Sequence, residues 1–463
     1  MRISTLAIFS SLFFLLLFTS CKEDEPLPSI GEDGLFTDSG LETPEDPGAP
    51  SVDQDVIDWV VDNHHPVRSL SSINYSDLQF LDPLLANKRI VQLGESGHGV
   101  KEFNLAKVRL IKYLHEELGY NVLAFESGMF ECYFTQKNLI KGGNENGREL
   151  MNNSIFGVWS TREVEQLFNY VARTQSTAEP IILAGFDTQF SSSTGSVERG
   201  QFFYDLLVGV DSAYADKVRA FENSYRSLNF SSYEATLNNV NENRDSLVNQ
   251  YTELSDYLLT NQEAVRQTYS GPSLEVDLGI QLARSITYQI NQQYWASVEN
   301  FIRSSEVRDE GMARNASFLL NTFYPGVKMM IWAHNFHIRH ANSQIISQNG
   351  RSQIVMGEWL HEEFEQELYT IGFYAYEGRM ANNGRQVYEV NAPGAGSLES
   401  IMYRVRRKWV FLDLENQART NGNEWIYRPT EAKSWGVNRL RMTLDDNYDG
   451  ILFIHTVSPP SYL

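Results

Sequence analysis

Cysteine is nearly absent from this chain of 463 residues, which contains only Cys21 and Cys132. If Cys21 is modified, no disulfide can form within the mature chain, so a hydrophobic core must stabilise the fold. Basic residues are also scarce, since 38 Lys and Arg stand against 59 Asp and Glu, for a formal net charge of −21. An acidic chain repels the phosphate backbone, so we expect no nucleic-acid partner.

A hydrophobic run opens the chain, within MRISTLAIFSSLFFLLLFTSC (residues 1–21). One basic residue, an apolar core and small residues before Cys21 indicate a secretory signal peptide rather than a spanning helix. The small residues before the cysteine resemble the lipobox of bacterial lipoproteins, which implies lipidation of Cys21 after cleavage. An ordinary signal peptide with a chance cysteine is the alternative. The expected location is the cell envelope, with a lipid anchor in the outer membrane.

Residues 22–55 are rich in Pro, Gly, Ser and acids and lack apolar periodicity, so they predict a flexible acidic tether. Lys22 and eleven acids give the tether a charge of −10, and removing this and the +1 of Arg2 from −21 leaves −12 for residues 56–463. An acidic run directly after a lipidated cysteine resembles the export signal of surface-exposed lipoproteins in some Gram-negative bacteria. We expect residues 56–463 to form the folded domain.

Four apolar runs each end in titratable side chains: RIVQLGESGHG, NVLAFES, PIILAGFD and VKMMIWAHNFH. Near-continuous apolar runs are typical of strands buried on both faces, and residues 102–118 and 161–173 between them have helical periodicity. This order predicts parallel strands, whose carboxyl ends share the sheet edge where ligands bind. The residues expected to meet at that edge are Glu95, His98, Glu126, Asp187, His334 and His337.

Residues 198–320 consist of long helical stretches without a strand-like run, which predicts a helical insertion. An independent helical domain is the alternative. Further strands are expected in YTIGFYAY, RQVYEV, KWVFLDL and GILFIHTV. The predicted fold class is α/β, with a mostly parallel sheet flanked by helices and a helical lobe inserted over the active-site edge.

His98 lies between two glycines, which we expect to take positive φ values and to leave the imidazole uncovered. A neutral imidazole can take a proton from water, and Glu95 and Glu126 could orient the ring and stabilise its cation. The sequence GESGH departs from the G-x-S-x-G nucleophile motif at its last position. Activation of water by His98 is therefore favoured over Ser96 as a nucleophile.

His334 and His337 are predicted to line the site and bind substrate. Their spacing, with acids nearby, would also suit a zinc or iron ion, but no HExxH motif is present and we expect no metal or other cofactor. Lys107 and Arg109 follow the GHG turn and are predicted to hold a substrate oxygen or pair with Glu126. A solvated helix face is the alternative for both.

Several motifs, in one order and spacing, resemble the erythromycin esterase family. They are LGESGHGVKEFNLAKVRLIKYL, AFES, Trp-x-Thr at residues 159–161, AGFDTQ, RDEGMARN, WAHNFH and MGEWL, within about residues 81–378. The resemblance implies an α/β core with a helical lobe over the cleft, and hydrolysis of a macrolide lactone by water. It implies His98 as general base, Glu95 and Glu126 as its partner carboxylates, and His334 and His337 in the site wall. Gly97 stands where the family usually has Thr, so the substrate stays open.

The predicted function is hydrolysis of an ester or macrolide-type lactone by a His-activated water. The expected partners are a small-molecule substrate and, through the lipid at Cys21, a membrane. Asp187 is grouped with the substrate contacts, although a scaffold role is favoured for it. Two other classes stay open from the sequence: a metal- or haem-binding envelope lipoprotein on a related sheet, and a metal-dependent peptidase.

Overall fold

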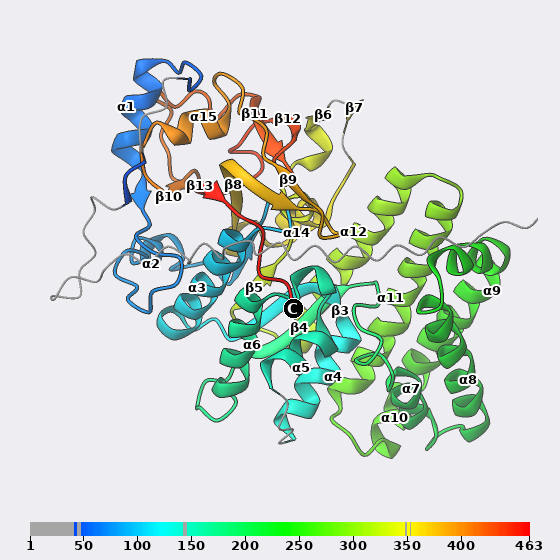
Figure 1. The fold of residues 1–463 in the computed structure, drawn as a ribbon. Helices are drawn as coiled ribbons and strands as arrows, with labels where there is room; N and C mark the ends of the chain where they lie inside the picture. The colour runs from blue at the N-terminus through cyan, green and yellow to red at the C-terminus, as the bar shows by residue number, and fades with distance from the viewer. Residues whose placement is uncertain (1–40, 44–47, 142–145, 348–349, 352) are drawn as a thin grey trace, which may run out of the picture. The chain divides into compact units, whose positions relative to one another are not determined.

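A sheet of nine strands lies at the centre of the described part of the chain (Figure 1). The structure is a computed structural model and describes residues 41–43, 48–141, 146–347, 350–351 and 353–463. The predicted signal peptide, Cys21 and most of the predicted tether lie outside these residues. Among the described helices, none is long and apolar enough to cross a membrane.

The folded unit begins at Leu41, inside the segment predicted as a tether. Leu41 is buried, and its carbonyl oxygen accepts a hydrogen bond from Lys408 N–H at 2.9 Å. Thr43 N–H donates to the carbonyl oxygen of Arg406 at 3.1 Å. These backbone bonds attach residues 41–43 to the loop before β10 (Trp409–Asp413), so the folded unit starts before residue 56.

The strand order in the central sheet is β1-β10-β13-β8-β2-β5-β3-β4, and β9 pairs with β8. The other strands are β1 (His65–Pro66), β2 (Ile90–Leu93), β3 (Val122–Gly128), β4 (Ile182–Asp187), β5 (Met329–Trp332), β8 (Leu368–Ala381), β9 (Val387–Glu389) and β13 (Gly450–Val457). Pairing is parallel from β13 through to β4 and antiparallel at β1, β9 and β10. The predicted α/β class with a mostly parallel sheet is confirmed.

The four apolar runs of the sequence form β2, β3, β4 and β5, which are neighbours in the sheet. In register, Leu93 lies beside Trp332, and Trp332 lies beside Phe125. Because these strands are parallel, their carboxyl ends lie at one edge. The residues that follow them are thereby brought to one region.

Side chains of these strands alternate between two hydrophobic cores, because successive residues of a strand point to opposite faces. One core combines Ile90, Val122, Ala124, Met329 and Ile331 with side chains of the helical lobe. The other combines Val91, Leu93, Leu123, Phe125, Met330 and Trp332 with α3 (Lys101–Leu118) and α6 (Arg162–Thr174). Burial on both faces explains why the strand sequences are apolar without alternation.

The two helices predicted between the first strands have the expected ends. Gly119 follows α3 with a φ of 71°, the left-handed conformation that glycine adopts without strain. The Thr161 side chain accepts a hydrogen bond from Val164 N–H at 3.3 Å and caps α6.

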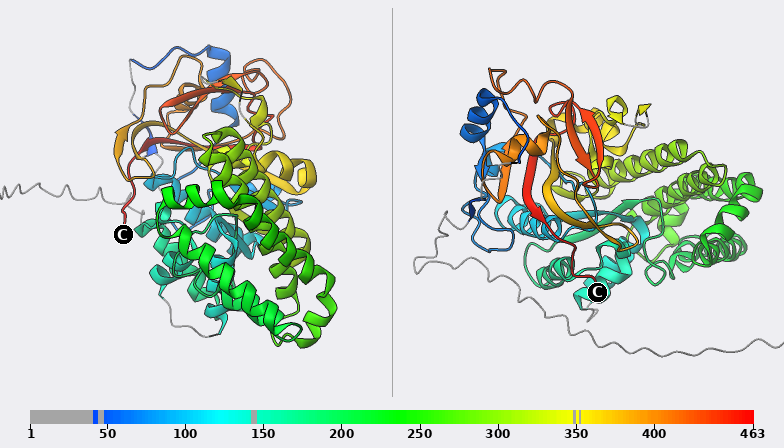
Figure 2. Two further views of the ribbon diagram at one scale, coloured as in Figure 1. Left: turned by 90° about the vertical axis from the view of Figure 1, so that its right-hand side faces the viewer. Right: turned by 45° about the horizontal axis from the view of Figure 1, so that its top comes forward.

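Residues 199–318 form the helical lobe, between β4 and β5. Its helices are α7 (Arg199–Leu207), α8 (Ser212–Asn229), α9 (Tyr233–Thr260), α10 (Gln262–Thr268), α11 (Leu274–Ser297) and α12 (Phe301–Phe318). In the lobe, drawn in green in Figure 2, α9 and α11 pack against each other, α8 packs against α7 and α9, and α11 packs against α12. The last helix, α12, packs beside β4, the final strand in the sheet order, so the lobe adjoins that edge.

The remaining helices connect and cover the sheet. They are α1 (Gln54–Asn63), α2 (Leu81–Leu84), α4 (Met129–Ile140), α5 (Gly147–Ser154), α13 (Asn335–Ile338), α14 (Met356–Phe364) and α15 (Leu398–Tyr403). Short 3-10 turns are η2 (Gly157–Trp159), η4 (Asn342–Gln344) and η5 (Glu365–Glu367), and η3 (Leu319–Phe323) is a π turn.

A second sheet, which the sequence pattern does not predict, lies outside the central one. Its strand order is β11 (Thr430–Ser434), β12 (Asn438–Met442), β6 (Ile346–Ser347) and β7 (Gly350–Arg351). The turn between β11 and β12 contains Trp435 with a φ of 55°. Left-handed backbone is uncommon for a bulky residue, so this turn holds its indole in one place at a conformational cost.

Candidate active site

A cavity of about 670 Å³ opens at the carboxyl ends of the parallel strands. Its walls come from the turns after β2, β3, β4 and β5, from η2, from α12 and from two hairpin turns near the C-terminus. The lining residues are His98, Glu126, Phe156, Gly157, Val158, Trp159, Gln189, Arg308, His334, Phe336, His337, Asn383, Arg385, Ser434 and Trp435.

His98 is oriented by one buried carboxylate, that of Glu95. The His98 Nδ1–H donates to Glu95 Oε1 at 2.6 Å, and Trp159 Nε1–H donates to the same oxygen at 2.9 Å. The second oxygen, Oε2, accepts from Lys107 Nζ at 2.8 Å. Because Nδ1 carries the proton, the lone pair of the neutral ring is on Nε2.

The charges of Glu95 and Lys107 compensate each other inside the protein, since both side chains are fully buried. Burial alone would raise the pKa of Glu95, but the Lys107 charge and the hydrogen bond from His98 outweigh it and lower the pKa. Burial lowers the pKa of Lys107 to about 8, even with Glu95 beside it. At neutral pH the two groups form an ion pair, which keeps Glu95 an acceptor for His98.

Gly97 and Gly99 allow the turn that carries His98 to pack closely against the Trp435 ring and the backbone of Ala381. Neither Gly97 nor Gly99 has a positive φ, so the predicted reason for these glycines is wrong. A Cβ on Gly99 would lie 2.1 Å from the carbonyl oxygen of Ala381, and one on Gly97 would lie 3.3 Å from the Trp435 ring. Close approach of β8 and of the β11–β12 turn therefore selects small residues here.

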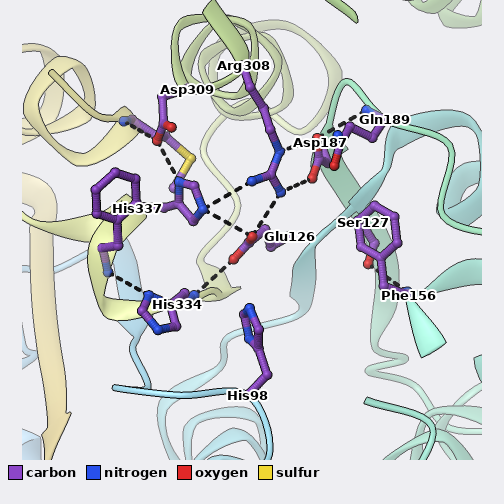
Figure 3. A network of polar contacts seen from close by, with 12 residues as sticks. His98, Glu126, Ser127, Phe156, Asp187, Gln189, Arg308, Asp309, His334 and His337 are labelled. Carbon is purple, nitrogen blue, oxygen red and sulfur yellow. Dashed lines mark hydrogen bonds and ion pairs between the residues drawn. The ribbon is translucent and has the colours of Figure 1, made fainter. Parts of the chain in front are cut away.

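A second cluster surrounds Glu126 and joins the sheet to the helical lobe (Figure 3). Glu126 Oε1 lies 2.9 Å from Arg308 Nη2 and 3.3 Å from His337 Nε2. Arg308 also binds both oxygens of Asp187, through Nε at 3.2 Å and Nη2 at 2.5 Å. His337 Nδ1 donates to Asp309 Oδ1 at 2.7 Å. One guanidinium and one imidazole are thus shared among three carboxylates.

Burial and neighbouring charges shift the pKa values of this cluster in opposite directions. Burial raises the pKa of Glu126, but His337 and Arg308 hold it well below its ordinary value. Burial lowers the pKa of His337, but Asp309 and Glu126 outweigh it and raise the pKa to about 9. At neutral pH Glu126 is therefore an anion and His337 a cation.

His334 presents a hydrogen-bond donor without a partner. Its Nδ1 accepts from Phe336 N–H at 3.1 Å, so the proton of the neutral ring lies on Nε2. Burial, with the nearby His98, holds the pKa of His334 well below its ordinary value, so the ring is neutral. Nε2 is buried and has no hydrogen-bond partner among the described residues, and the side chain lines the cavity.

Trp435 contacts both of these imidazoles. Its ring centroid lies 5.2 Å from that of His98, edge-on at 83°, and 5.2 Å from that of His334, stacked at 24°. Trp435 N–H donates to the Ser96 carbonyl oxygen at 2.6 Å, which ties the β11–β12 turn to the His98 turn. Figure 3 shows the His98 ring directed toward the Glu126 carboxylate, with His334 beside it.

No group of three or more His, Cys, Asp or Glu side chains within the described ranges is arranged to hold a metal ion. His334 and His337, whose spacing could suit a metal, are held instead by a backbone N–H and by two carboxylates.

A protein-family model matches the part of the chain that contains most of this site. The model of the family described as erythromycin esterase matches residues 115–457, more than half of the chain. The chain belongs to the erythromycin esterase family. The matched region includes Glu126, Arg308 and His334, and it begins after the turn that carries His98.

Two named proteins are similar in sequence to this erythromycin esterase family member over most of its length. Putative hydrolase YbfO of Bacillus subtilis is 32% identical over 87% of this chain and 91% of its own length. Erythromycin esterase type II of Escherichia coli is 24% identical over 74% of this chain and 85% of its own length. The chain is therefore a member of a family of hydrolases.

Two solved structures have a fold similar to that of this erythromycin esterase family member. A mutant of the erythromycin esterase EreC, in its open conformation, has a TM-score of 0.68 at 17% identity and covers 84% of this chain and 96% of its own. A Bacillus cereus protein has a TM-score of 0.75 at 18% identity and covers 89% of this chain and 100% of its own. At these identities the likeness shows the fold alone.

In this erythromycin esterase family member, the sequence-predicted residues divide into three groups. His98, Glu126, His334 and His337 line the cavity, and Glu95 lies directly behind His98. Lys107 and Asp187 do not line it; Lys107 supports Glu95, and Asp187 supports Arg308. Glu126 forms no hydrogen bond with His98 in the described structure; its bonds go to Arg308, to His337 and to His334 N–H.

Arg109 requires a correction, because it does not reach the cavity. Its guanidinium pairs with both oxygens of Asp77 and donates to the carbonyl oxygens of Ser69, Ser72 and Asn74. Arg109 is two positions after Lys107 on α3, so its side chain points to a different side of the helix from the one that faces Glu95. It therefore fastens the loop at residues 69–77 to α3 and cannot contact a substrate.

Four residues of the candidate site were not assigned a role from the sequence. Arg308, Asp309 and Trp159 lie in motifs that carry the family resemblance, but each reaches the site from a helix or turn far from the strand ends. Trp435 has no sequence signal, because the two-residue strands β6 and β7 and the short β11–β12 turn leave no periodic pattern.

The pKa of His337 predicts a pH dependence of stability. Its folded pKa, about 9, lies above the ordinary value of 6.5, so the stabilisation is fully present below pH 6.5 and is lost as pH rises through about 9. His337→Gln should be less stable than wild type at pH 6, and the difference should narrow by up to about 3 kcal/mol by pH 9.5. Denaturant unfolding at both pH values measures this, and a difference that stays constant would contradict a cationic His337.

Proposed function

We propose that this chain hydrolyses a carboxylic ester or a macrolide-type lactone with a water molecule activated by His98. The observation that carries the proposal is the pairing of His98 Nδ1 with the buried, ionised Glu95 at 2.6 Å, while the ring lines the cavity. This arrangement leaves Nε2 as a base toward the cavity. The family name and the hydrolase name of YbfO support the same reaction class.

In the proposed reaction, His98 Nε2 takes a proton from water as the water oxygen attacks the carbonyl carbon. The imidazolium that forms is stabilised by Glu95, whose other oxygen is held by Lys107. When the tetrahedral intermediate collapses, the ester C–O bond breaks and His98 returns the proton to the leaving alkoxide. The products are a carboxylic acid and an alcohol, which stay in one molecule when the substrate is a lactone.

His334 is the group best suited to stabilise the oxyanion. Its Nε2–H is a donor without a partner in the described structure, and its pKa keeps it neutral. Arg308 is less suited, because its guanidinium already binds Glu126 and Asp187. A fixed donor at the developing charge is worth about 2.7–4 kcal/mol in comparable sites.

Loss of the proposed base should abolish turnover. We expect His98→Ala to lower kcat/KM by about 10²–10⁴-fold on whichever macrolide or simple aryl ester the wild type hydrolyses, because general-base catalysis is lost. The matched control is His64→Ala at the end of α1, which is outside the cavity and should retain wild-type turnover. Hydrolysis that persists in His98→Ala would contradict the water-activation mechanism.

Loss of the proposed oxyanion donor should act on kcat rather than on KM. We expect His334→Phe, which keeps a ring against Trp435 but has no N–H, to lower kcat by about 10²–10³-fold. His334→Gln retains a side-chain N–H and should recover part of kcat. Steady-state kinetics test both variants; a change confined to KM, or equal loss in the two variants, would argue against an oxyanion contact.

We also propose that the mature protein is a lipoprotein of the cell envelope, anchored at Cys21. The support is the signal-like run and the small residues before Cys21. Mass spectrometry of the N-terminal peptide, after expression in a Gram-negative host, should find acylated Cys21, and Cys21→Ser should move the protein out of the membrane fraction. A mature N-terminus at another residue would reject the anchor.

A further inference from the structure

Three aromatic rings surround the His98 imidazole. The ring centroid of Trp159 lies 5.1 Å from that of His98, edge-on at 84°, and that of Trp435 lies 5.2 Å away, edge-on at 83°. The His334 ring lies at 5.1 Å and is inclined at 62°. Trp159 also donates a hydrogen bond to Glu95, the carboxylate that orients His98. Trp435 is the ring that contacts both imidazoles.

The β11–β12 turn holds the Trp435 indole through its backbone. Trp435 N–H donates to the Ser96 carbonyl oxygen at 2.6 Å, and the Trp435 carbonyl oxygen accepts from Tyr388 O–H at 3.0 Å. The carbonyl oxygen of the next residue, Gly436, accepts from Asn391 N–H at 2.9 Å. Left-handed backbone, here a φ of 55°, persists in a bulky residue only when its surroundings hold it. The indole therefore enters the cavity wall from a fixed direction.

The same indole covers the His334 imidazole. The two rings are stacked at 24° with their centroids 5.2 Å apart, and His334 is 4% exposed. A group that keeps water from an imidazole disfavours its protonation. The titratable or charged groups that act on His334 are His98, Glu126, His337 and Arg339. Trp435 adds an uncharged surface to these surroundings.

We propose that Trp435 is a positioning residue, whose indole fixes the His98 and His334 rings relative to each other and shields His334 from water. This role rests on the proposed hydrolysis and extends it to the second sheet, which carries Trp435. In that reaction one imidazole takes a proton from water while the other donates to the carbonyl oxygen. Both must therefore keep their geometry at one substrate carbonyl. An indole in contact with both rings restrains them without adding a charge to the cavity.

Loss of the flat ring should lower kcat more than it changes KM. Trp435→Leu and Trp435→Met keep an apolar side chain in the turn, and we expect each to lower kcat by about 10–10²-fold, as for misplaced catalytic groups. Trp435→Phe keeps a ring and should retain most of kcat. The left-handed backbone is common to all three variants, so its strain does not distinguish them. Steady-state kinetics measure this on an ester or lactone that wild type hydrolyses.

The matched control is Trp295→Leu. Trp295 is half-buried on α11, contacts Tyr294 and does not line the cavity. This variant removes an indole outside the site and should keep wild-type kcat. A change confined to KM, wild-type kcat in both variants without a ring, or equal loss in Trp295→Leu and Trp435→Leu would overturn the proposal. Thermal unfolding establishes that each variant is folded at the assay temperature.

NMR of the imidazoles tests the same role without turnover. In protein with isotope-labelled histidine, the signals of His98 and His334 are assigned from His98→Gln and His334→Gln and followed against pH. We expect the pKa of His334 to stay well below 6.5 in wild type and in Trp435→Phe. In Trp435→Leu it should rise towards 6.5, because water reaches the ring.

The NMR result separates this role from the proposed reaction. A raised pKa of His334 in Trp435→Leu supports the shielding by Trp435, even if no ester is hydrolysed. An unchanged titration of His334 in Trp435→Leu rejects the shielding, even if esters are hydrolysed.

Discussion

The guanidinium of Arg308 holds together the parts from which the site is built. Glu126 lies near the carboxyl end of β3 and Asp187 ends the neighbouring parallel strand β4, so two buried negative charges that repel each other lie at one edge of the sheet. Arg308 comes from α12 in the helical lobe and binds both. The lobe is therefore joined to the sheet by charge as well as by apolar packing. Removal of one member of such a buried cluster costs about 3–5 kcal/mol, because the remaining charge is left uncompensated.

Two separate charge systems surround the histidines of the site. His98 faces Glu95, whose charge is shared with Lys107, so its ring is oriented through Nδ1. His337 lies between two carboxylates and is a cation, whereas His334 is buried beside an aromatic ring and is neutral. An imidazole oriented through Nδ1, a neutral donor and a cation thus line one cavity. Chemistry that needs proton transfer and charge stabilisation together can use all three.

The sequence predicted the parts of the site that lie next to strands. Apolar runs located β2, β3, β4 and β5, and parallel order then placed Glu95, His98, Glu126 and His334 at one edge. Side-chain direction on helices was not available from the same pattern. Lys107 and Arg109 are two positions apart on α3, so they point to different sides, and only Lys107 reaches Glu95.

The remaining contributions depend on long-range packing. Arg308 reaches Glu126 across 182 positions of the chain, and no local pattern indicates which residue of the predicted helical lobe contacts the sheet edge. The turn with Trp435 belongs to a sheet of short strands, whose pairing is set by tertiary contacts rather than by hydrophobic alternation. The glycines on either side of His98 were predicted to have positive φ values, but the structure requires them for close packing against Ala381 and Trp435. Either cause selects glycine, so the sequence does not distinguish the two.

The contact between Trp435 and His98 also determines when the site can exist during folding. The two residues are 337 positions apart (98 and 435), so their contact closes a very long loop and carries a large entropic cost. Contacts of such separation form after local helices and neighbouring strands. His98 is among the first site residues to leave the ribosome, and of the aromatic rings that contact it, Trp159 follows within 61 positions (98 and 159), whereas Trp435 comes from nearly the last segment. The imidazole pair therefore acquires its enclosed environment only when the whole domain has folded.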